Sequence, residues 1–354
     1  MAENKFDTVL QYLSLEGEIK QTLPAFAASG DFIKKLYAFM IKTRLFDQKA
    51  IALQRTGKIG TYPSCEGQEA IGIGVASAMN DSDVLCPYYR DHGAPLWRGV
   101  LMEEIFLYWG GDERGSNFKN ARQDFPICVP IASQTLHAAG IAKAMQLKNE
   151  KRATVVLLGD GATSRGDFYE AMNAAGVWNL PLVFVISNNQ WAISVPRHAQ
   201  TKAETLAQKG IAAGIAGIQV DGNDVIAVHD AMLKALEKAR SGGGPSLIEA
   251  ITYRLSDHTT ADDAKRYRSE VEVAEHRNKD PLIRLKHYLE KNCGFNEVEE
   301  NNLRQSLQEE VMAAVSRFLS IEPMKASSLF DDHFASIPHD LAKQKQEFQD
   351  LTGE

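Results

Sequence analysis

The clearest hydrophobic pattern in the chain lies between residues 153 and 191. Two short apolar runs rich in valine, 153–158 and 182–187, flank a stretch with apolar residues at helical spacing. Each run is too short for a buried helix, so the pattern predicts a strand–helix–strand unit with parallel strands. Because the carboxyl ends of parallel strands lie side by side, we expect Asp160, after the first strand, and Asn189, after the second, to converge.

Apolar patterns predict further elements on both sides of this unit. Apolar residues at helical spacing run from Asp31, read as an N-cap, to Leu53, and Gly57 stops that helix. Another helix opens at residues 65–69 and carries three glycines that would let another backbone approach closely: Gly67, Gly72 and Gly74. Strands are expected at 83–87, 218–220 and 246–253, and helices at 133–145, 205–215, 225–240 and beyond Asp280.

This order of elements predicts an α/β fold, with a mostly parallel sheet flanked by helices and with helical N- and C-terminal extensions. We expect an N-terminal arm at residues 1–30, a ligand-binding domain at 31–290 and a C-terminal helical extension at 291–354. Asp221 lies in an Asp-Gly-Asn-Asp run, which is typical of a turn and helix cap, so we interpret it as structural.

The polar residues at the two central strand ends indicate a cation site. One carboxylate and one amide oxygen suit Mg²⁺, which takes few protein ligands and fills its other positions from phosphate and water. Gly159 and Gly161 let the backbone bring N–H groups close to a phosphate, and a helix starting near Gly166 points its positive end the same way.

Glycine-rich turns also occur in three further contexts, and each fits this segment less well. A Walker loop requires a lysine where the chain has Asp167, and that interpretation fails. A dinucleotide fingerprint is weak, because Ser164 stands at the third glycine position and Phe184 replaces the later acid. A plain linking turn accounts for the glycines but not for Asp160 between them or for the two asparagines that close the next strand.

Gly-Asp-Gly at 159–161, followed about 30 residues later by Asn-Asn, resembles the thiamin diphosphate motif. The run at 166–173 is similar to the alpha subunit of the thiamin diphosphate-dependent 2-oxo acid dehydrogenase decarboxylating component, of the pyruvate and branched-chain types. The resemblance implies the thiamin diphosphate-binding fold, with Mg²⁺ bound by the side chains of Asp160 and Asn189 and by the carbonyl of Trp191. The family usually has tyrosine at this last position, and a backbone ligand tolerates the change.

The same resemblance assigns residues to the cofactor. Tyr89 and Arg90 follow a predicted strand, and an arginine offers a planar fork to phosphate oxygens. Alone, such a pair is more often a surface ion pair, but family members place both residues on the cofactor diphosphate. Gly161 and Ala162, inside the motif, are also assigned to cofactor binding.

The loop at 128–134 is expected to lie under the cofactor. By resemblance, Ile131 is the large apolar side chain that bends the cofactor, and the backbone of Val129 contacts its pyrimidine ring. Branched-chain members also hold a potassium ion with this loop, and three residues fit: Pro130, Ser133 and Gln134. Cys128 departs from the pattern, so the ion is not predicted. Without the resemblance, this segment leads into a buried helix rich in small residues.

A polar loop after the last predicted strand contains His258. Unaided, a loop histidine is usually exposed and idle, but the family pattern assigns His258 to the diphosphate and the substrate, as a catalytic residue. Thr259 stands where mitochondrial members have a regulatory phosphoserine, and a phosphate there would add about two negative charges beside the diphosphate. By resemblance, Tyr88 and the segment 60–63 line the acyl pocket.

Composition indicates an ordinary globular protein and excludes several classes. The net charge of −7 argues against a general nucleic-acid surface. The four cysteines form neither a zinc pattern nor a disulfide framework: Cys65, Cys86, Cys128 and Cys293. There is no run of 18 apolar residues, and the N-terminal sequence lacks a targeting signal, so we expect no membrane partner and a cytoplasmic location.

The resemblance implies oxidative decarboxylation of pyruvate with reductive acylation of a lipoyl domain. A branched-chain 2-oxo acid, 2-oxoisovalerate, is the alternative substrate, because the chain leans towards different types in different segments. No glutamate has an apolar setting that would raise its pKa for the cofactor's pyrimidine nitrogen. We therefore expect a beta subunit to supply it, in an assembly of two alpha and two beta chains with a lipoyl-bearing acyltransferase, and the chain alone to be inactive.

Two other hypotheses belong to different classes. The first is a single-chain thiamin enzyme of the transketolase kind, although the chain is short for both the diphosphate and the pyrimidine domains. The second is a non-catalytic diphosphate-binding subunit that serves only assembly. A lysate pull-down that finds no partner would support the first hypothesis. The second would be preferred if adding a beta subunit and cofactor gave no decarboxylation.

Overall fold

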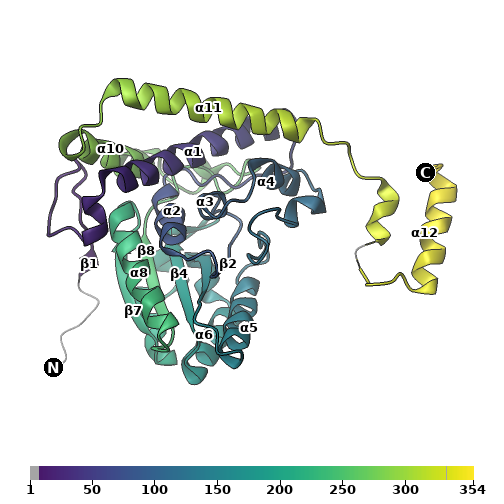
Figure 1. Ribbon diagram of the computed structural model, residues 1–354, viewed down its shortest axis with the longest axis horizontal. Helices are drawn as coiled ribbons and strands as arrows, with labels where there is room; N and C mark the ends of the chain where they lie inside the picture. The colour runs from purple at the N-terminus through teal and green to yellow at the C-terminus, as the bar shows by residue number, and fades with distance from the viewer. Residues whose placement is uncertain (1–7, 332) are drawn as a thin grey trace.

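A six-stranded parallel sheet, in the order β1-β7-β8-β4-β3-β2, forms the centre of the molecule (Figure 1). The computed structural model describes residues 8–331 and 333–354, so the expectation about the N-terminal sequence lies largely outside them. The strands are β1 (Val9–Leu10), β2 (Val84–Cys86), β3 (Thr154–Gly159), β4 (Leu182–Asn188), β7 (Ala216–Asp221) and β8 (Ser246–Ile251). The predicted α/β class is confirmed.

The predicted strand–helix–strand unit is β3, α6 (Gly166–Trp178) and β4. The two strands pair in parallel, with Gly159 of β3 opposite Ser187 of β4. Asp160 therefore begins the segment after β3 at the same edge of the sheet where Asn189 follows β4. The crossover brings together two residues that are far apart in the sequence, as the pattern predicts.

Alternate residues of β3 face opposite sides of the sheet, and each side has its own core. Val155 packs in a core with α1, α2 and α8, and Val156 packs in a second core with α5 and α6. These helices are α1 (Gly30–Arg55), α2 (Glu69–Ala78), α8 (Val225–Arg240) and α5 (Ser133–Leu147). Because both faces are covered, the central strands appear in the sequence as continuous apolar runs.

Two helix predictions are wrong in detail. The N-cap of α1 is Ser29, whose Oγ accepts a hydrogen bond from the backbone N–H of Phe32 at 3.3 Å, and Asp31 lies in the first turn. The helix expected at 205–215 is a 3₁₀ helix, η4 (Ala207–Ala213). Gly210 lets the chain after η4 pass close to the helix, since a Cβ there would lie 2.7 Å from the carbonyl oxygen of Ile215.

The glycines of the second helix have two different roles. The helix α2 begins at Glu69, so Gly67 precedes it, with φ at +86°, a conformation that favours glycine. The expected close approach is confirmed at Gly74, where an added Cβ would lie 2.7 Å from the Cβ of Val228 on α8. Missing side-chain volume thus lets α2 and α8 pack closely on one face of the sheet.

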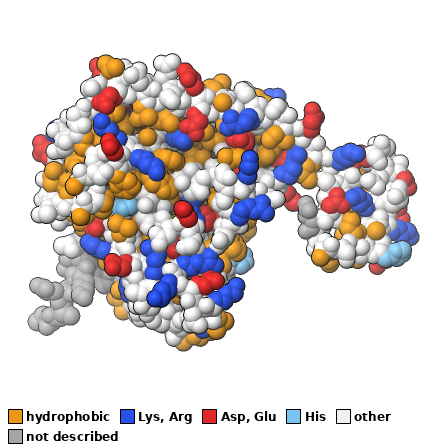
Figure 2. All heavy atoms as spheres, in the orientation of Figure 1, with side chains coloured by type: hydrophobic (Ala, Val, Ile, Leu, Met, Phe, Trp, Pro, Cys, Tyr) orange, Lys and Arg blue, Asp and Glu red, His pale blue; other side chains and the backbone are white. Residues whose placement is uncertain are grey.

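The two ends of the chain are placed differently. Near the N-terminus, the N–H groups of Tyr12 and Leu13 each donate to Asp224 Oδ2 at 2.7 Å, which ties this segment to the start of α8. At the other end, α11 (Glu297–Leu319) packs along α1 and α4 (Met102–Trp109). The last helix, α12 (His339–Thr352), stands apart from the main body with η6 (Ala326–Phe330), as a separate lobe (Figures 1 and 2).

The remaining elements are short, apart from α10, and connect the layers. They are η1 (Ala25–Ala28), α3 (Gly93–Trp97), η2 (Glu113–Ser116), η3 (Asp160–Ser164), β5 (Trp191–Ala192), β6 (Val195–Pro196), α7 (Arg197–Gln200), η5 (Ala264–Arg266), α9 (Glu270–Arg277) and α10 (Pro281–Asn292). Strands β5 and β6 form a small antiparallel pair outside the main sheet. Within the described residues, no helix is both long enough and apolar enough to cross a bilayer.

Candidate active site

A cavity of about 190 Å³ opens where β2, β3 and β4 end. Its wall contains all ten residues that the sequence singled out for cofactor, metal or catalysis: Tyr89, Arg90, Val129, Ile131, Asp160, Gly161, Ala162, Asn189, Trp191 and His258. Tyr88, expected in the acyl pocket, lies there too. The carboxyl edge of an open parallel sheet is the usual ligand-binding position in this fold class.

Asp160 is the buried carboxylate of the cavity. It starts η3, directly after β3, and is 2% exposed. Its Oδ2 accepts a hydrogen bond from Gln200 Nε2 at 2.9 Å. Burial raises the pKa of the Asp160 carboxyl, and the hydrogen bond from Gln200 opposes that rise only in part. A divalent cation in the cavity would supply the positive charge that a buried carboxylate needs, so the residue fits the predicted metal role.

Asn189 and Trp191 complete the predicted ligand set. Asn189 Oδ1 accepts from the backbone N–H of Trp191 at 3.2 Å, and its Nδ2 donates to Gln68 Oε1 at 3.2 Å. The neighbouring Asn188 instead donates to Glu249 Oε1 at 2.7 Å, so only the second asparagine serves the cavity. Among the described residues, no three His, Cys, Asp or Glu side chains form a metal cluster. The predicted ligand set contains only one such side chain, Asp160, and an Mg²⁺ site of this kind does not need a cluster.

The position of the Trp191 indole explains why tryptophan can replace the tyrosine that the family usually has here. The indole is buried with Tyr253 and Leu255, and its Nε1 donates to Tyr253 Oη at 3.2 Å. The side chain therefore packs in a small separate core. Only the backbone carbonyl of Trp191 remains for a metal role, and that carbonyl does not depend on the side-chain type.

Two arginines surround His258. Arg90, 2% exposed, places Nη2 at 2.9 Å from His258 Nδ1 and donates from Nη2 to the His258 carbonyl at 2.8 Å. Arg254, fully buried, lies with Nη1 at 3.4 Å from the same Nδ1. Burial, followed by the positive charges of these arginines, lowers the pKa of His258 to about 3. Since an arginine only donates, Nδ1 is the acceptor, and the imidazole proton is on Nε2.

The loop at 128–134 forms the rim. Val129 is 46% exposed and Ile131 is 42% exposed, so two apolar side chains stand at the mouth of the cavity. The carbonyl of Pro130 accepts from Cys128 Sγ at 3.4 Å, and Gln134 Nε2 donates to the Leu157 carbonyl at 2.8 Å. Among the potassium candidates, Pro130 and Gln134 line the cavity and Ser133 does not.

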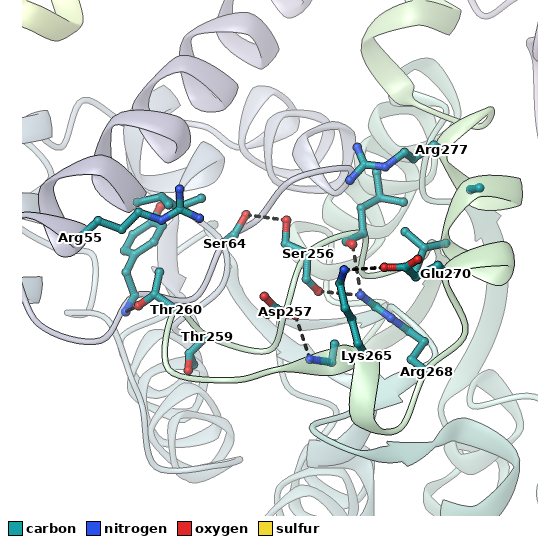
Figure 3. A pocket seen from close by; sticks show the side chains of 16 residues that line it. Arg55, Ser64, Ser256, Asp257, Thr259, Thr260, Lys265, Arg268, Glu270 and Arg277 are labelled. Carbon is teal, nitrogen blue, oxygen red and sulfur yellow. Dashed lines mark hydrogen bonds and ion pairs between the residues drawn. The ribbon is translucent and has the colours of Figure 1, made fainter.

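Residues of the segment 255–268 line a second, larger cavity of about 470 Å³ (Figure 3). His258 lines the first cavity, whereas Asp257 and Thr259 line the second. Its charged lining comes from Arg55, Asp257, Lys265, Arg268, Glu270 and Arg277, of which Lys265 pairs with Glu270 at 2.6 Å. Tyr62, expected in the acyl pocket, lines this second cavity.

One expectation about glutamates needs correction. Burial raises the pKa of Glu69 to about 7, so the chain does contain a glutamate with a raised pKa. Its carboxylate pairs with Arg44 Nε and accepts from the N–H of Gly67 at 3.0 Å, and it does not line the cofactor cavity. This burial could not be predicted from the sequence, because Glu69 is the first residue of α2 and is buried only where α1 packs against it. No glutamate lines the cavity within the described chain.

The sequence did not single out two further residues, Gln68 and Gln200. Gln68 is the N-cap residue of α2, and Gln200 is the last residue of the short α7. Both hydrogen-bond to a predicted metal ligand. No spacing or motif indicated them, because each comes from a segment whose position depends on the tertiary fold.

The fold and the cavity define an α/β protein in which a carboxylate, an amide, an arginine and a histidine line a cavity at the carboxyl edge of its sheet. The chain belongs to the Dehydrogenase E1 component family, whose model matches residues 37–324. Proteins named pyruvate dehydrogenase E1 component subunit alpha, from Staphylococcus epidermidis and Staphylococcus aureus, are 37% identical over 349 residues, which cover 98% of this chain and 94% of each relative. A protein of the same name from Mycoplasma genitalium is 35% identical over 347 residues, covering 98% and 97%. The family resemblance is confirmed.

Proposed function

We propose that this chain is the alpha subunit of a pyruvate dehydrogenase that uses thiamin diphosphate and Mg²⁺. The observation that carries the proposal is the convergence of Asp160, Asn189 and the Trp191 carbonyl with Arg90 and His258 around one cavity. Membership of the Dehydrogenase E1 component family supports it. The names of the relatives favour pyruvate over a branched-chain 2-oxo acid, which remains the alternative substrate.

The residues of the cavity divide into cation and anion binders. The oxygens of Asp160, Asn189 and the Trp191 backbone would hold Mg²⁺, whose other ligands would be phosphate oxygens and water. Arg90 would donate to the diphosphate through the N–H groups that are not bonded to Ser64 and His258. The backbone N–H groups of Gly161 and Ala162 would add neutral donors.

The other side chains would orient the organic part and the substrate. Val129 and Ile131 would offer apolar contact to the rings of the cofactor, and Tyr89 would lie beside its diphosphate. With its proton on Nε2, His258 can donate a hydrogen bond to an anionic group in the cavity. Thiamin diphosphate supplies the carbon nucleophile for the 2-oxo acid and accepts the electron pair left when CO₂ departs.

Catalysis would require a beta subunit. The cavity has no glutamate of its own among the described residues, and apolar side chains at its mouth are exposed: Val129 and Ile131, with Leu136 in the first turn of α5. Such an apolar surface beside an incomplete site supports a second chain that covers it. We propose an assembly of two alpha and two beta chains that acylates the lipoyl group of an acyltransferase.

The test is to co-purify the chain with its beta chain and to measure CO₂ release with an artificial electron acceptor. Pyruvate should react faster than 2-oxoisovalerate, and the assembly with Asp160→Ala should be inactive. Faster reaction of 2-oxoisovalerate would establish the branched-chain alternative. No release from either acid would indicate a non-catalytic assembly subunit, and full activity of the chain alone would indicate a single-chain enzyme.

A further inference from the structure

Two glutamines lie directly behind the two side chains that are proposed as metal ligands. Gln200, at the end of α7, donates from Nε2 to Asp160 Oδ2 at 2.9 Å. Gln68, before α2, accepts at Oε1 from Asn189 Nδ2 at 3.2 Å and from Ser187 Oγ at 3.2 Å. Gln68 is 5% exposed. Each proposed ligand therefore has its own glutamine partner, and the partners come from separate segments of the chain.

The hydrogen bonds determine which atom of each ligand stays available. With Oδ2 of Asp160 engaged by an amide donor, Oδ1 is the oxygen left for a cation. For Asn189, the backbone N–H of Trp191 can only donate, so the atom it meets at 3.2 Å is Oδ1. The Asn189 Nδ2 group consequently faces Gln68, which must present its oxygen. An asparagine held in this way cannot rotate to turn its NH₂ group towards a cation.

We propose that Gln68 and Gln200 are positioning residues that orient the oxygens of Asn189 and Asp160 towards a divalent cation. The proposal rests on the metal role assigned under the proposed function and goes beyond it by adding two residues that do not touch the ion. Groups that orient metal ligands by hydrogen bonds commonly change metal affinity about 10–100-fold when they are removed.

The size of the ion gives a readout that a purely structural role would not change. Mg²⁺ requires near-ideal octahedral geometry, at about 2.0–2.1 Å, whereas Ca²⁺ accepts looser geometry at about 2.3–2.6 Å. If the glutamines orient the oxygens, their removal weakens Mg²⁺ binding more than Ca²⁺ binding. If they only support the local fold, their removal weakens both ions equally.

The experiment uses the assembled alpha and beta chains with Gln200→Met or Gln68→Met in the alpha chain. Methionine keeps a similar length and removes the amide donor and acceptor. Calorimetric titrations with Mg²⁺ and with Ca²⁺, at saturating thiamin diphosphate, give the two dissociation constants. We expect Mg²⁺ binding to weaken about 10-fold for each variant and Ca²⁺ binding to weaken less than about 3-fold. The control is Gln208→Met on η4, which does not line the cavity and should bind both ions as the wild type does.

The outcomes separate this inference from the proposed function. Unchanged Mg²⁺ binding in the methionine variants, or an equal loss for both ions, overturns the positioning role while the wild type still binds. A wild-type assembly that binds no thiamin diphosphate with Mg²⁺ overturns the proposed function itself. Gln68 is buried, so Gln68→Met could fail to fold. In that case Gln200→Met tests the positioning role, because Gln200 is only half-buried.

Discussion

Arg90 holds His258 by two contacts, from Nη2 to Nδ1 at 2.9 Å and from Nη2 to the backbone carbonyl at 2.8 Å. The guanidinium thus sets both the tautomer of the imidazole and the position of its backbone. The backbone N–H of His258 donates in turn to Asp262 Oδ2 at 2.9 Å. His258 therefore lines the cavity as a neutral imidazole with its proton on Nε2.

Replacing Arg90 should change both the histidine and cofactor binding. In the wild type without cofactor, the low pKa of His258, about 3, keeps the ring neutral at pH 5. Arg90→Gln removes a positive neighbour, so the pKa should rise. Loss of a charged hydrogen-bond donor should weaken thiamin diphosphate binding about 10–100-fold, since such bonds contribute about 1.5–3 kcal/mol. Imidazole ¹⁵N shifts and cofactor titration measure the two effects.

The matched control for Arg90 is Arg266→Gln, which removes an exposed positive charge from η5. It should leave both the ¹⁵N shifts and the cofactor affinity unchanged. A wild-type His258 that is already protonated at pH 6, or an unchanged affinity in Arg90→Gln, would contradict this arrangement of the arginine and the histidine.

Removing the charge of Asp160 should abolish metal-dependent cofactor binding. Asp160→Asn keeps the shape of the side chain and the partner Gln200 but loses the negative charge that attracts Mg²⁺. Calorimetry with Mg²⁺ and thiamin diphosphate on the two-subunit assembly should show no heat of binding. Asp167→Asn, which changes a carboxylate at the start of α6 outside the cavity wall, should bind normally. Equal effects of the two changes would argue against the site.

Buried His92 should make the fold sensitive to acid. Burial lowers the pKa of His92 to about 3, and the ring stacks on Tyr62 at 5.1 Å between centroids. The unfolded state gains a proton near pH 6.5 and the folded state does not, so stability falls as the pH drops from about 6.5 to about 3, by about 1.4 kcal/mol per pH unit. His92→Phe should flatten this fall in thermal unfolding measured at pH 7 and pH 5.

For His92→Phe, the control is His339→Phe at the start of α12, where no residue is buried. It should lose stability between pH 7 and pH 5 as the wild type does. If His92→Phe shows the same decline as the wild type, buried His92 is not the group that responds to acid.

The contact between α2 and α8 should not tolerate a larger residue. A Cβ at Gly74 would lie 2.7 Å from the Cβ of Val228, both in rigid helices, so Gly74→Ala should destabilise the fold by about 1–3 kcal/mol. Gly30→Ala is the control, because its Cβ would meet Cys293 Sγ at an ordinary 3.6 Å. That change should be neutral or stabilising by up to about 1 kcal/mol. Urea unfolding of the two variants measures the difference.

The central strand–helix–strand unit could be predicted from the sequence because the features that define it are close together in the chain. Valine-rich runs, a glycine turn and polar residues at strand ends all lie between residues 153 and 191, so the convergence of Asp160 and Asn189 follows from parallel pairing alone. The resemblance then added residues from other segments, such as Arg90 and His258. These residues line the cavity, and their roles there stay predictions.

The features that the sequence missed depend on tertiary packing. Glu69 has a raised pKa because it is buried in the folded chain beside Arg44 of α1, and nothing around it in the sequence shows that burial. Gln68 and Gln200 reach the proposed metal ligands through the placement of α2 and α7. Ser29 caps α1 because its backbone is extended, whereas Asp31, also a good cap, already lies in the helix. Propensity could not choose between these two.

The pairing of Gly159 with Ser187 has a consequence for how the protein loses its structure on heating. Asp160 directly follows Gly159 and Asn189 lies two residues after Ser187, so the strand spacing of about 4.8 Å fixes where both segments leave the sheet. Amide exchange at the last paired residues, Gly159 and Ser187, should be as slow as in the middle of the strands, because opening this edge means unpairing two central strands. On heating, cation binding at the proposed site and the native structure should therefore be lost in the same transition.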